Sequence, residues 1–185
     1  GGSADIINGG DGDDSINGGD GDDNLTGGNG ADTFTISAGN DVIADLETND
    51  AIVVNDATAQ VTANDVSAFV ADSGTSSTGT VIINSASGGS TITMTDATSG
   101  TFTINGGSSG DIITGGGDND VIDGNGSDDD ITGGGGDDSL TGGAGNDTFR
   151  VDSGSDTIVD LGGTAGGDSD VLIVSSGATA TISNV

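Results

Sequence analysis

The sequence predicts an all-β fold: a parallel β-roll, built as a β-solenoid, in which two repeat arrays are separated by a β-rich insert. The first observation is a period of nine residues, which begins as GGDGDDSIN at 9–17 and GGDGDDNLT at 18–26 and returns as GGAGNDTFR at 142–150. The second is that every repeat has aspartate at its sixth position and a bulky apolar residue at its eighth. A fixed period of this kind indicates stacked coils rather than a single globular core.

Each repeat divides into a turn and a short strand. The glycine-rich first six residues turn sharply, because glycine adopts positive φ without steric cost. The last three residues form a brief strand whose central apolar side chain points inward while its neighbours point outward. One repeat is therefore half a coil, and two repeats close a full coil. Strands of successive coils then stack in parallel about 4.8 Å apart.

Two arrays follow this period without a missed position. Array one covers residues 1–44 and array two covers residues 106–159. The sixth-position aspartates are Asp5, Asp14, Asp23, Asp32, Asp41, Asp111, Asp120, Asp129, Asp138, Asp147 and Asp156. The eighth-position apolar residues are Ile7, Ile16, Leu25, Phe34, Ile43, Ile113, Ile122, Ile131, Leu140, Phe149 and Ile158.

The insert at 45–105 lacks the period. It contains strand-like runs such as TITMT at 91–95, which alternates threonine with an apolar residue. We expect one short helix at 64–71, with Asp65 as its N-terminal cap. We also expect the insert to cover the exposed ends of the arrays, because open strand edges and solenoid ends need caps.

A longer repeat indicates how the chain continues after array two. Residues 136–161 align with 21–46 without gaps, with 16 identities in 26 positions, and DVLIV at 170–174 answers DAIVV at 50–54. Residues 160–185 are therefore predicted to be a β cap that starts a second, truncated module of a longer protein.

Charge and composition limit the partners. The chain has 30 aspartates and one glutamate against a single arginine, for a net charge of −30. This charge argues against nucleic acid and anionic membranes, which need basic surfaces, and no apolar run is long enough for membrane insertion. Cysteine and histidine are absent. Oxygen is therefore the only abundant ligand atom, and hard cations such as calcium prefer it.

An enzyme fits the composition poorly, and we expect no catalytic residues. His, Cys, Lys and Tyr are all missing, so most acid–base and nucleophilic chemistry lacks its groups. Paired carboxylates could hydrolyse glycosides, but the repeat already accounts for these aspartates.

Stacking turns the aspartates into paired cation sites. Residues eighteen apart become vertical neighbours, so like charges would repel unless a divalent ion lay between them. Turn carbonyls can complete a shell of six to eight oxygens. Counting gaps predicts three sites in array one and four in array two, about seven Ca²⁺ in all. The predicted columns are Asp5, Asp23 and Asp41; Asp14 and Asp32; Asp111, Asp129 and Asp147; and Asp120, Asp138 and Asp156.

The motif G-G-x-G-x-D-x-U-x resembles the repeats-in-toxin (RTX) family. The resemblance implies a parallel β-roll whose calcium is held by sixth-position aspartates two repeats apart and by carbonyls of turn glycines. It also implies a bacterial protein exported by type I secretion and folded on calcium outside the cell. The glycines it implicates are Gly10, Gly12, Gly19, Gly21, Gly28, Gly30, Gly134, Gly136, Gly143 and Gly145. Motif glycines are replaced at Ser3, Ser109, Asp118, Asn125 and Ser127.

Carboxylates outside the sixth-position columns are assigned other roles. The fifth-position residues Asp13, Asp22, Asp128 and Asp137 suit solvated charge as well as ligation. Asp45 and Asp160 lie just past each array and are further candidate ligands. Asp50, Asp56, Asp65, Asp72 and Asp96 are interpreted as ordinary surface residues.

These observations predict a structural calcium-binding domain of a secreted or cell-surface bacterial protein, of the surface-layer or adhesin type. Its expected partners are calcium and either further copies of itself or a cell-surface glycan or protein. The alternative is the C-terminal secretion and carrier module of a type I-secreted protease, lipase or epimerase. In that case the catalytic domain lies outside this chain.

Overall fold

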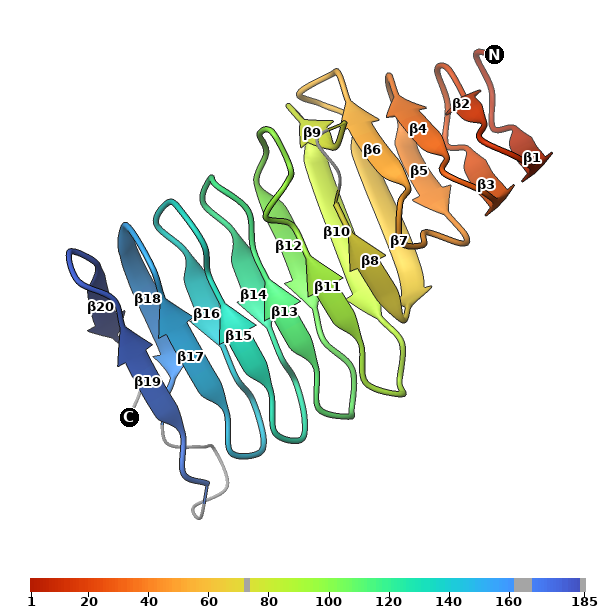
Figure 1. Cartoon of the computed structure of the whole chain (residues 1–185). Helices are drawn as coiled ribbons and strands as arrows, with labels where there is room; N and C mark the ends of the chain where they lie inside the picture. Colours follow the sequence, from red (N-terminus) through yellow and green to blue (C-terminus); the bar gives the residue numbers. More distant parts are fainter. Residues whose placement is uncertain (72–73, 162–167, 184–185) are drawn as a thin grey trace.

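The computed structural model is a parallel β-solenoid (Figure 1) and describes residues 1–71, 74–161 and 168–183. The described residues contain strands, turns and bends but no helix. Every pairing between named strands in this part of the chain is parallel. The predicted all-β parallel β-roll is confirmed.

The strands form two faces. The first face is one ten-stranded sheet, here called the long sheet, in the order β1 (Ile6–Asp11), β3 (Asn24–Asn29), β5 (Asn40–Ile43), β7 (Gln60–Val66), β10 (Thr80–Ser85), β12 (Phe102–Asn105), β14 (Val121–Asp123), β16 (Ser139–Thr141), β18 (Ser155–Asp160) and β20 (Thr179–Ile182). The second face has a four-stranded sheet of β2 (Ser15–Asn17), β4 (Thr33–Ile36), β6 (Ala51–Val54) and β9 (Ser76–Ser77), and a six-stranded sheet of β8 (Ala68–Val70), β11 (Thr91–Thr93), β13 (Ile112–Thr114), β15 (Asp130–Thr132), β17 (Thr148–Val151) and β19 (Val171–Val174).

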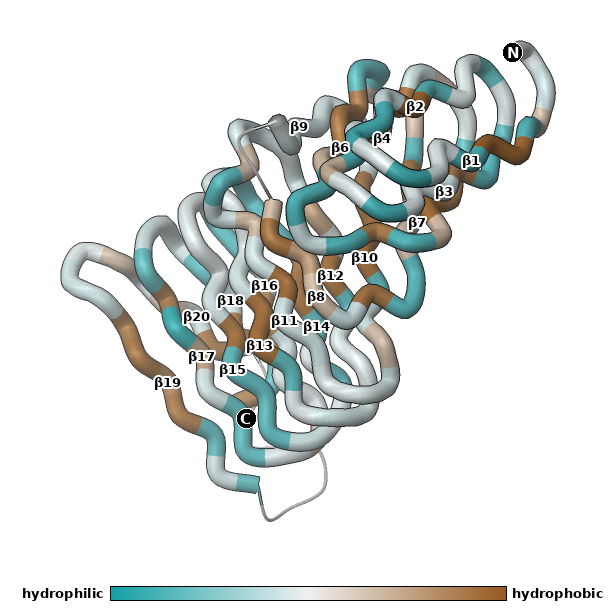
Figure 2. Tube along the Cα trace, turned by 45° about the vertical axis from the view of Figure 1, so that its right-hand side comes forward, coloured by the Kyte–Doolittle hydropathy of each residue, from teal (hydrophilic) through white to brown (hydrophobic). Residues whose placement is uncertain are grey.

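The eighth-position residues form the core of the arrays. The register pairs Ile122 with Leu140 on the long sheet and Ile131 with Phe149 on the opposite face, each pair eighteen residues apart. With the exception of Ile7 in the first coil, these side chains are buried between the two faces. Figure 2 shows the hydrophobic segments lying along the strands and the hydrophilic ones in the turns.

The insert continues the solenoid. Its strands join the same ladders, because β7 pairs with β5 and β12 pairs with β14. The register matches Ile43 with Ala63, Ala63 with Ile83 and Ile83 with Ile104, so the coils here exceed eighteen residues. The insert thus covers the inner strand edges of both arrays by adding further coils to the same ladders. Among the named strands of the insert, β8 and β9 pair on one side only.

The predicted helix at 64–71 is wrong. This segment lies at the end of β7 and in β8, with Asp65 in the left-handed region at φ +57°. Phe69 is fully buried and pairs with Ile92 of the next coil. Stacking of Phe69 on a neighbouring strand outweighs a local helical preference, because propensity is a weak prior beside tertiary packing.

The second face steps sideways within the insert. One stretch of chain supplies both β8, which pairs with β11, and β9, which pairs with β6 (Figure 1). The long sheet runs past this step without interruption. After array two, β19 and β20 extend the ladders of β17 and β18. The division of the chain into domains at residues 1–44, 45–105, 106–159 and 160–185 stays a prediction.

A core substitution should separate the stacked apolar column from the exposed positions. We expect Leu140→Ala, at a fully buried residue of β16, to lower the free energy of unfolding in saturating calcium by about 2–5 kcal/mol. Ile112→Ala, at a residue that is 53% exposed, should change it by about 0.5 kcal/mol or less. Denaturant titration measures both, and equal losses would contradict the assignment of the core.

Candidate functional site

The sixth-position aspartates stack in columns along the turns. The backbone N–H of Asp23 donates to Oδ1 of Asp41 at 2.9 Å, and Asp129 donates in the same way to Asp147 at 2.9 Å. The predicted stacking of residues eighteen apart is therefore present. The same bond joins Asp5 to Asp23, Asp14 to Asp32, Asp111 to Asp129, Asp120 to Asp138, and Asp138 to Asp156.

These carboxylates are buried even though they carry charge. Nine of the eleven are at most 3% exposed, and only Asp5 and Asp14 of the first turns are more open. The Oδ2 atoms of most are buried without a hydrogen-bond partner, namely those of Asp14, Asp23, Asp32, Asp41, Asp129, Asp138 and Asp156. A buried carboxylate oxygen without a partner is costly, so each of these atoms is a candidate to bind a cation.

The first-position glycines form the other wall of this space. A Cβ at Gly9 would lie 2.5 Å from Oδ2 of Asp14 and 2.7 Å from the carbonyl oxygen of Gly27 in the next coil. A Cβ at Gly115 would likewise meet Oδ2 of Asp120 and the carbonyl oxygen of Gly133. Carboxylate and carbonyl oxygens therefore converge on a cradle that any side chain would fill. Such a donor set, all oxygen and partly charged, suits a hard divalent cation.

The turn glycines supply the backbone shape of the cradle. The ten glycines implicated from the sequence all have φ between +98° and +143°. Where the motif is broken, Asn125 and Ser127 still adopt φ of +69° and +71°. The first two turns of array two differ, because Gly107, Ser109, Gly116 and Asp118 do not take positive φ.

The entry to array two satisfies its own carboxylates. Both oxygens of Asp120 accept backbone N–H groups, from Phe102 at 2.8 Å and from Gly116 at 2.6 Å. Asp111 is held in the same way by Ser90 and Gly107. These two aspartates therefore have less need of a cation than those deeper in the array.

Burial raises the pKa of the stacked aspartates. Desolvation is the main cause and raises the pKa to about 7 for Asp129 and Asp138 and to about 6 for Asp120. Backbone N–H donors oppose this shift, and neighbouring carboxylates add to it. The pKa is also raised, for the same leading reason, at Asp41, Asp50, Asp147 and Asp156.

The fifth-position aspartates accept backbone N–H groups from residues eighteen positions later in the chain, whereas the sixth-position aspartates accept them from residues eighteen positions earlier. Oδ1 of Asp22 accepts the N–H of Asn40 at 2.9 Å, and Oδ1 of Asp137 accepts the N–H of Ser155 at 2.8 Å. Asp13 and Asp128 accept from Ala31 and Asn146 in the same way. All four side chains are exposed. A ligand role for them stays a prediction.

The remaining candidate carboxylates differ in their hydrogen-bond partners. Asp45 accepts the N–H of Gly27 at 2.8 Å and of Gly28 at 2.9 Å, so both of its oxygens hold a turn of the preceding coil. Asp118 accepts the N–H of Gly100 at 2.9 Å. Asp160 lies at the end of β18, and its charge helps to raise the pKa of Asp147.

Sequence reasoning missed two members of the columns. Asp50 is 2% exposed and its Oδ1 accepts the N–H of Asp32 at 3.0 Å, while Oδ1 of Asp170 accepts the N–H of Asp147 at 3.0 Å. The interpretation of Asp50 as a surface residue is therefore wrong. Its signal was available, because Asp50 lies eighteen residues after Asp32 and begins the DAIVV segment that DVLIV answers at Asp170.

No described part of the chain gathers three or more His, Cys, Asp or Glu side chains in a metal-holding group. The cradles at Asp14 and Asp129 differ from such clusters, because a main-chain carbonyl oxygen, that of Gly27 or Gly142, approaches the same glycine as the orphan carboxylate oxygen. The described residues also contain no helix long and apolar enough to cross a membrane.

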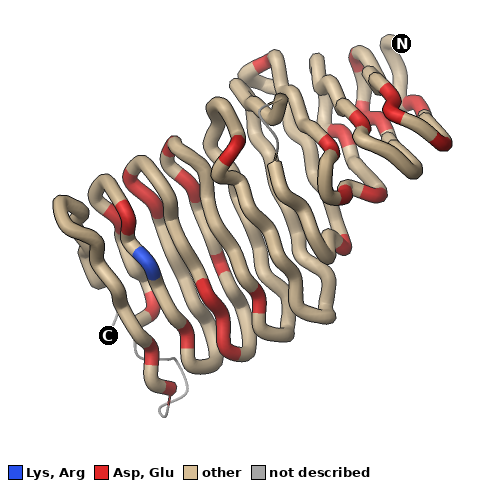
Figure 3. The backbone as a smooth tube through the Cα atoms, in the orientation of Figure 1, with Lys and Arg blue, Asp and Glu red and all other residues tan. Residues whose placement is uncertain are grey.

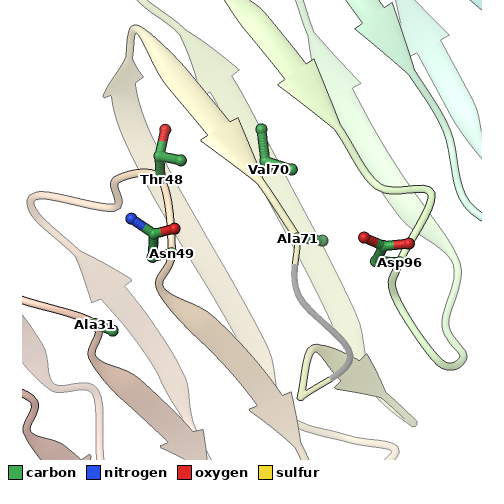
Figure 4. A pocket seen from close by; sticks show the side chains of 6 residues that line it. All are labelled: Ala31, Thr48, Asn49, Val70, Ala71 and Asp96. Atoms are coloured by element: carbon green, nitrogen blue, oxygen red, sulfur yellow. The ribbon is translucent and has the colours of Figure 1, made fainter.

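A hollow lies beside the step in the second face. Figure 4 shows Thr48, Asn49, Val70 and Asp96 around it, and its volume is about 400 Å³. Among the described residues that line it, Asp96 is the single carboxylate, so this part of the lining lacks the paired carboxylates of the turn columns.

Fold and site together define a parallel β-solenoid whose turns stack buried carboxylates against glycine carbonyls. The family model of the RTX calcium-binding nonapeptide repeat, in four copies, matches residues 1–34, 103–130 and 123–158. These segments are RTX calcium-binding nonapeptide repeats, and the insert between them lies largely outside the match. Searches of curated proteins and of solved structures returned no match.

The raised pKa values make the metal-free fold sensitive to pH. The pKa of about 7 for Asp129 and Asp138 lies above the ordinary 3.8, so between these values the folded chain binds more protons than the unfolded chain. Stability in chelator is therefore highest at low pH and is lost as pH rises toward 7. We expect a stronger far-UV β signal in chelator at pH 5 than at pH 7.5. The opposite order would contradict the burial of these carboxylates.

The cradle should not tolerate a methyl group. A Cβ at Gly133 would collide with Oδ2 of Asp138, whereas a Cβ at Gly117 would have no atom within 4 Å. We expect Gly133→Ala to lower the stability of the calcium-loaded domain by about 1–3 kcal/mol, as overpacking does. Gly117→Ala should change it by about 0.5 kcal/mol or less. Thermal unfolding in saturating calcium compares the two, and equal effects would exclude a tight cradle.

Proposed function

We propose that this chain is a structural calcium-binding domain of a secreted or cell-surface bacterial protein, of the surface-layer or adhesin type. The observation that carries the proposal is the set of buried Oδ2 atoms without a hydrogen-bond partner, repeated from coil to coil. Five of them, in Asp14, Asp23, Asp32, Asp129 and Asp138, lie so close to the first glycine of their turn that a Cβ there would collide with them. A cation supplies the missing partner and neutralises the stacked charges.

The ligands we assign are the sixth-position aspartates and the carbonyls of the positive-φ turn glycines. Seven adjacent pairs follow from the repeat, and Asp50 and Asp170 extend two of the columns. At ten times the dissociation constant each bound ion adds about 1.4 kcal/mol. Seven ions together would contribute about 10 kcal/mol, comparable with the whole stability of a typical domain. Calcium binding is therefore coupled to folding of the arrays.

This coupling suits export. A domain that is loosely folded at low calcium and folds at high calcium would remain unfolded in the cytoplasm and form its β-roll outside. RTX repeats support the type I route and the extracellular location that we propose. The long solenoid, with its parallel coils and its lack of Lys, Cys, His and Pro, suits a rigid wall or stalk.

A charge-neutral substitution tests the assigned ligands. We expect Asp138→Asn to raise the calcium concentration at the folding midpoint about tenfold and to strengthen the β signal in chelator, because it removes a buried charge together with a ligand. Asp137→Asn makes the same change at the exposed neighbour and keeps an oxygen for Ser155. It should leave both properties nearly unchanged.

Titration calorimetry on the unmodified chain gives the number of sites, and circular dichroism follows folding in the same samples. We expect about seven calcium ions per chain and a β signal that is weak in chelator. One or two ions, or an identical β signal without calcium, would reject the proposal. Equal effects of Asp138→Asn and Asp137→Asn would reject the ligand assignment.

The carrier-module alternative rests on the same repeats. It differs in what the rest of the protein contains. A catalytic domain on the N-terminal side in the full-length protein supports the carrier, and further arrays and inserts support the surface protein.

A further inference from the structure

Charge is distributed unevenly over this very acidic molecule. The carboxylates gather mainly in the turns along the long edges of the solenoid (Figure 3). The outward face of the long sheet carries few charges over its middle strands. Across β5, β7, β10, β12 and β14 the exposed or half-buried side chains are Val, Ile, Thr, Asn, Gln and Ser, together with two carboxylates, Asp65 and Asp123.

One row of side chains across this face has the same order of residue types when it is read from either end. The register places Val42 beside Thr62, Thr62 beside Ile82, Ile82 beside Thr103 and Thr103 beside Val121. We call these five residues the outward row. Each lies between buried neighbours in its strand and is itself half-buried or exposed. Reading outward from Ile82 gives threonine and then valine on both sides.

The symmetry continues beyond the outward row. The next positions on the long sheet are Asn24 on one side and Ser139 on the other. A parallel row of asparagines has the same centre, because Asn84 accepts from Asn105 at 2.7 Å and donates to Asn64 at 2.7 Å. Both rows therefore look alike from either end of the insert.

We propose that this face is an interface between two copies of the chain, related by a two-fold axis that lies between the two facing sheets, parallel to β10 and over Ile82. A two-fold interface uses the same patch on both copies, so residue i contacts residue j and j contacts i. The axis places Ile82 against Ile82 of the second copy, Thr62 against its Thr103 and Val42 against its Val121. This inference rests on the self-association that we propose for the domain and names the surface that carries it.

Electrostatics favours this face over the others. Two copies of net charge −30 repel, and seven divalent ions on each would still leave an excess of negative charge. Contact costs least where carboxylates are fewest, and pairs of exposed charges farther apart than about 8 Å are screened at physiological salt. β-branched side chains on a sheet also pack against a facing sheet at about 10 Å, as in β-sandwiches.

The area predicts a modest affinity. Because β10 is the fifth of ten strands, the axis lets nine strands of each copy face the other. Nine strands about 4.8 Å apart, each about 10 Å wide, present about 430 Å² per copy and about 860 Å² in total. This total is below the usual size of specific interfaces and suits a weak one. We therefore expect a dimer whose fraction rises with protein concentration, and only in calcium, because the arrays must be folded.

Sedimentation velocity in calcium tests the interface. We expect a concentration-dependent dimer that Ile82→Asp weakens at least tenfold, since the axis brings the two new charges together. Ile112→Asp makes the same change at an exposed isoleucine on the opposite face and should not weaken the dimer. Calcium titration of each variant verifies folding. A wild-type chain that stays monomeric, or equal effects of the two variants, would overturn the proposal without affecting the calcium assignment.

Crosslinking tests the axis itself, because the chain contains no cysteine of its own. A short thiol-to-thiol reagent that spans about 10 Å should join two copies of Ile82→Cys. It should also join copies of the Val42→Cys/Val121→Cys double variant. Val42→Cys alone should not react, because the axis separates those positions by about 20 Å. Efficient crosslinking of Val42→Cys alone, or of Ile112→Cys as well as Ile82→Cys, would reject this arrangement.

Discussion

The constraint on which the rest of the structure depends is the stacking of like charges in register. A nine-residue repeat that closes a coil every eighteen residues must place each sixth-position aspartate above another. The backbone N–H of one aspartate binds one oxygen of the next, and in seven of the eleven aspartates the second oxygen is buried without a hydrogen-bond partner. Burial then raises the pKa of residues such as Asp129 to about 7. Turn shape, pH sensitivity and cation binding all follow from this geometry.

The insert meets the same stacking problem with neutral groups. Its coils carry an asparagine ladder, in which Asn105 donates to Asn84 and Asn84 donates to Asn64. Its core contains larger side chains, among them Phe69, Met94 and Phe102. Amides in register satisfy one another, whereas carboxylates in register need a cation. Coils that stack carboxylates therefore lie on both sides of coils that stack neutral amides.

Much of the site could be predicted from the sequence, because its members are periodic. The columns of Asp23 and Asp41 or Asp129 and Asp147 follow from counting eighteen residues along the chain. Asp50 obeys the same count but lies outside the array boundary chosen at residue 44, so it was assigned to the surface. Asp170 lies 23 residues after Asp147 instead of eighteen, a spacing that the repeat does not specify.

By itself, the sequence determined the β-roll, the apolar column and the stacked aspartates. A strict period places each of these residues a constant number of positions from the residue it contacts, so the contacts can be counted along the chain. Only the tertiary structure decided how the insert joins the arrays. Its strands have no period, and Phe69 becomes a strand residue because Ile92 of the next coil lies beside it. Only the structure, too, aligned Val42, Thr62, Ile82, Thr103 and Val121 into one symmetric face. Register between coils of unequal length is set by packing, which the spacing of residues along the chain does not encode.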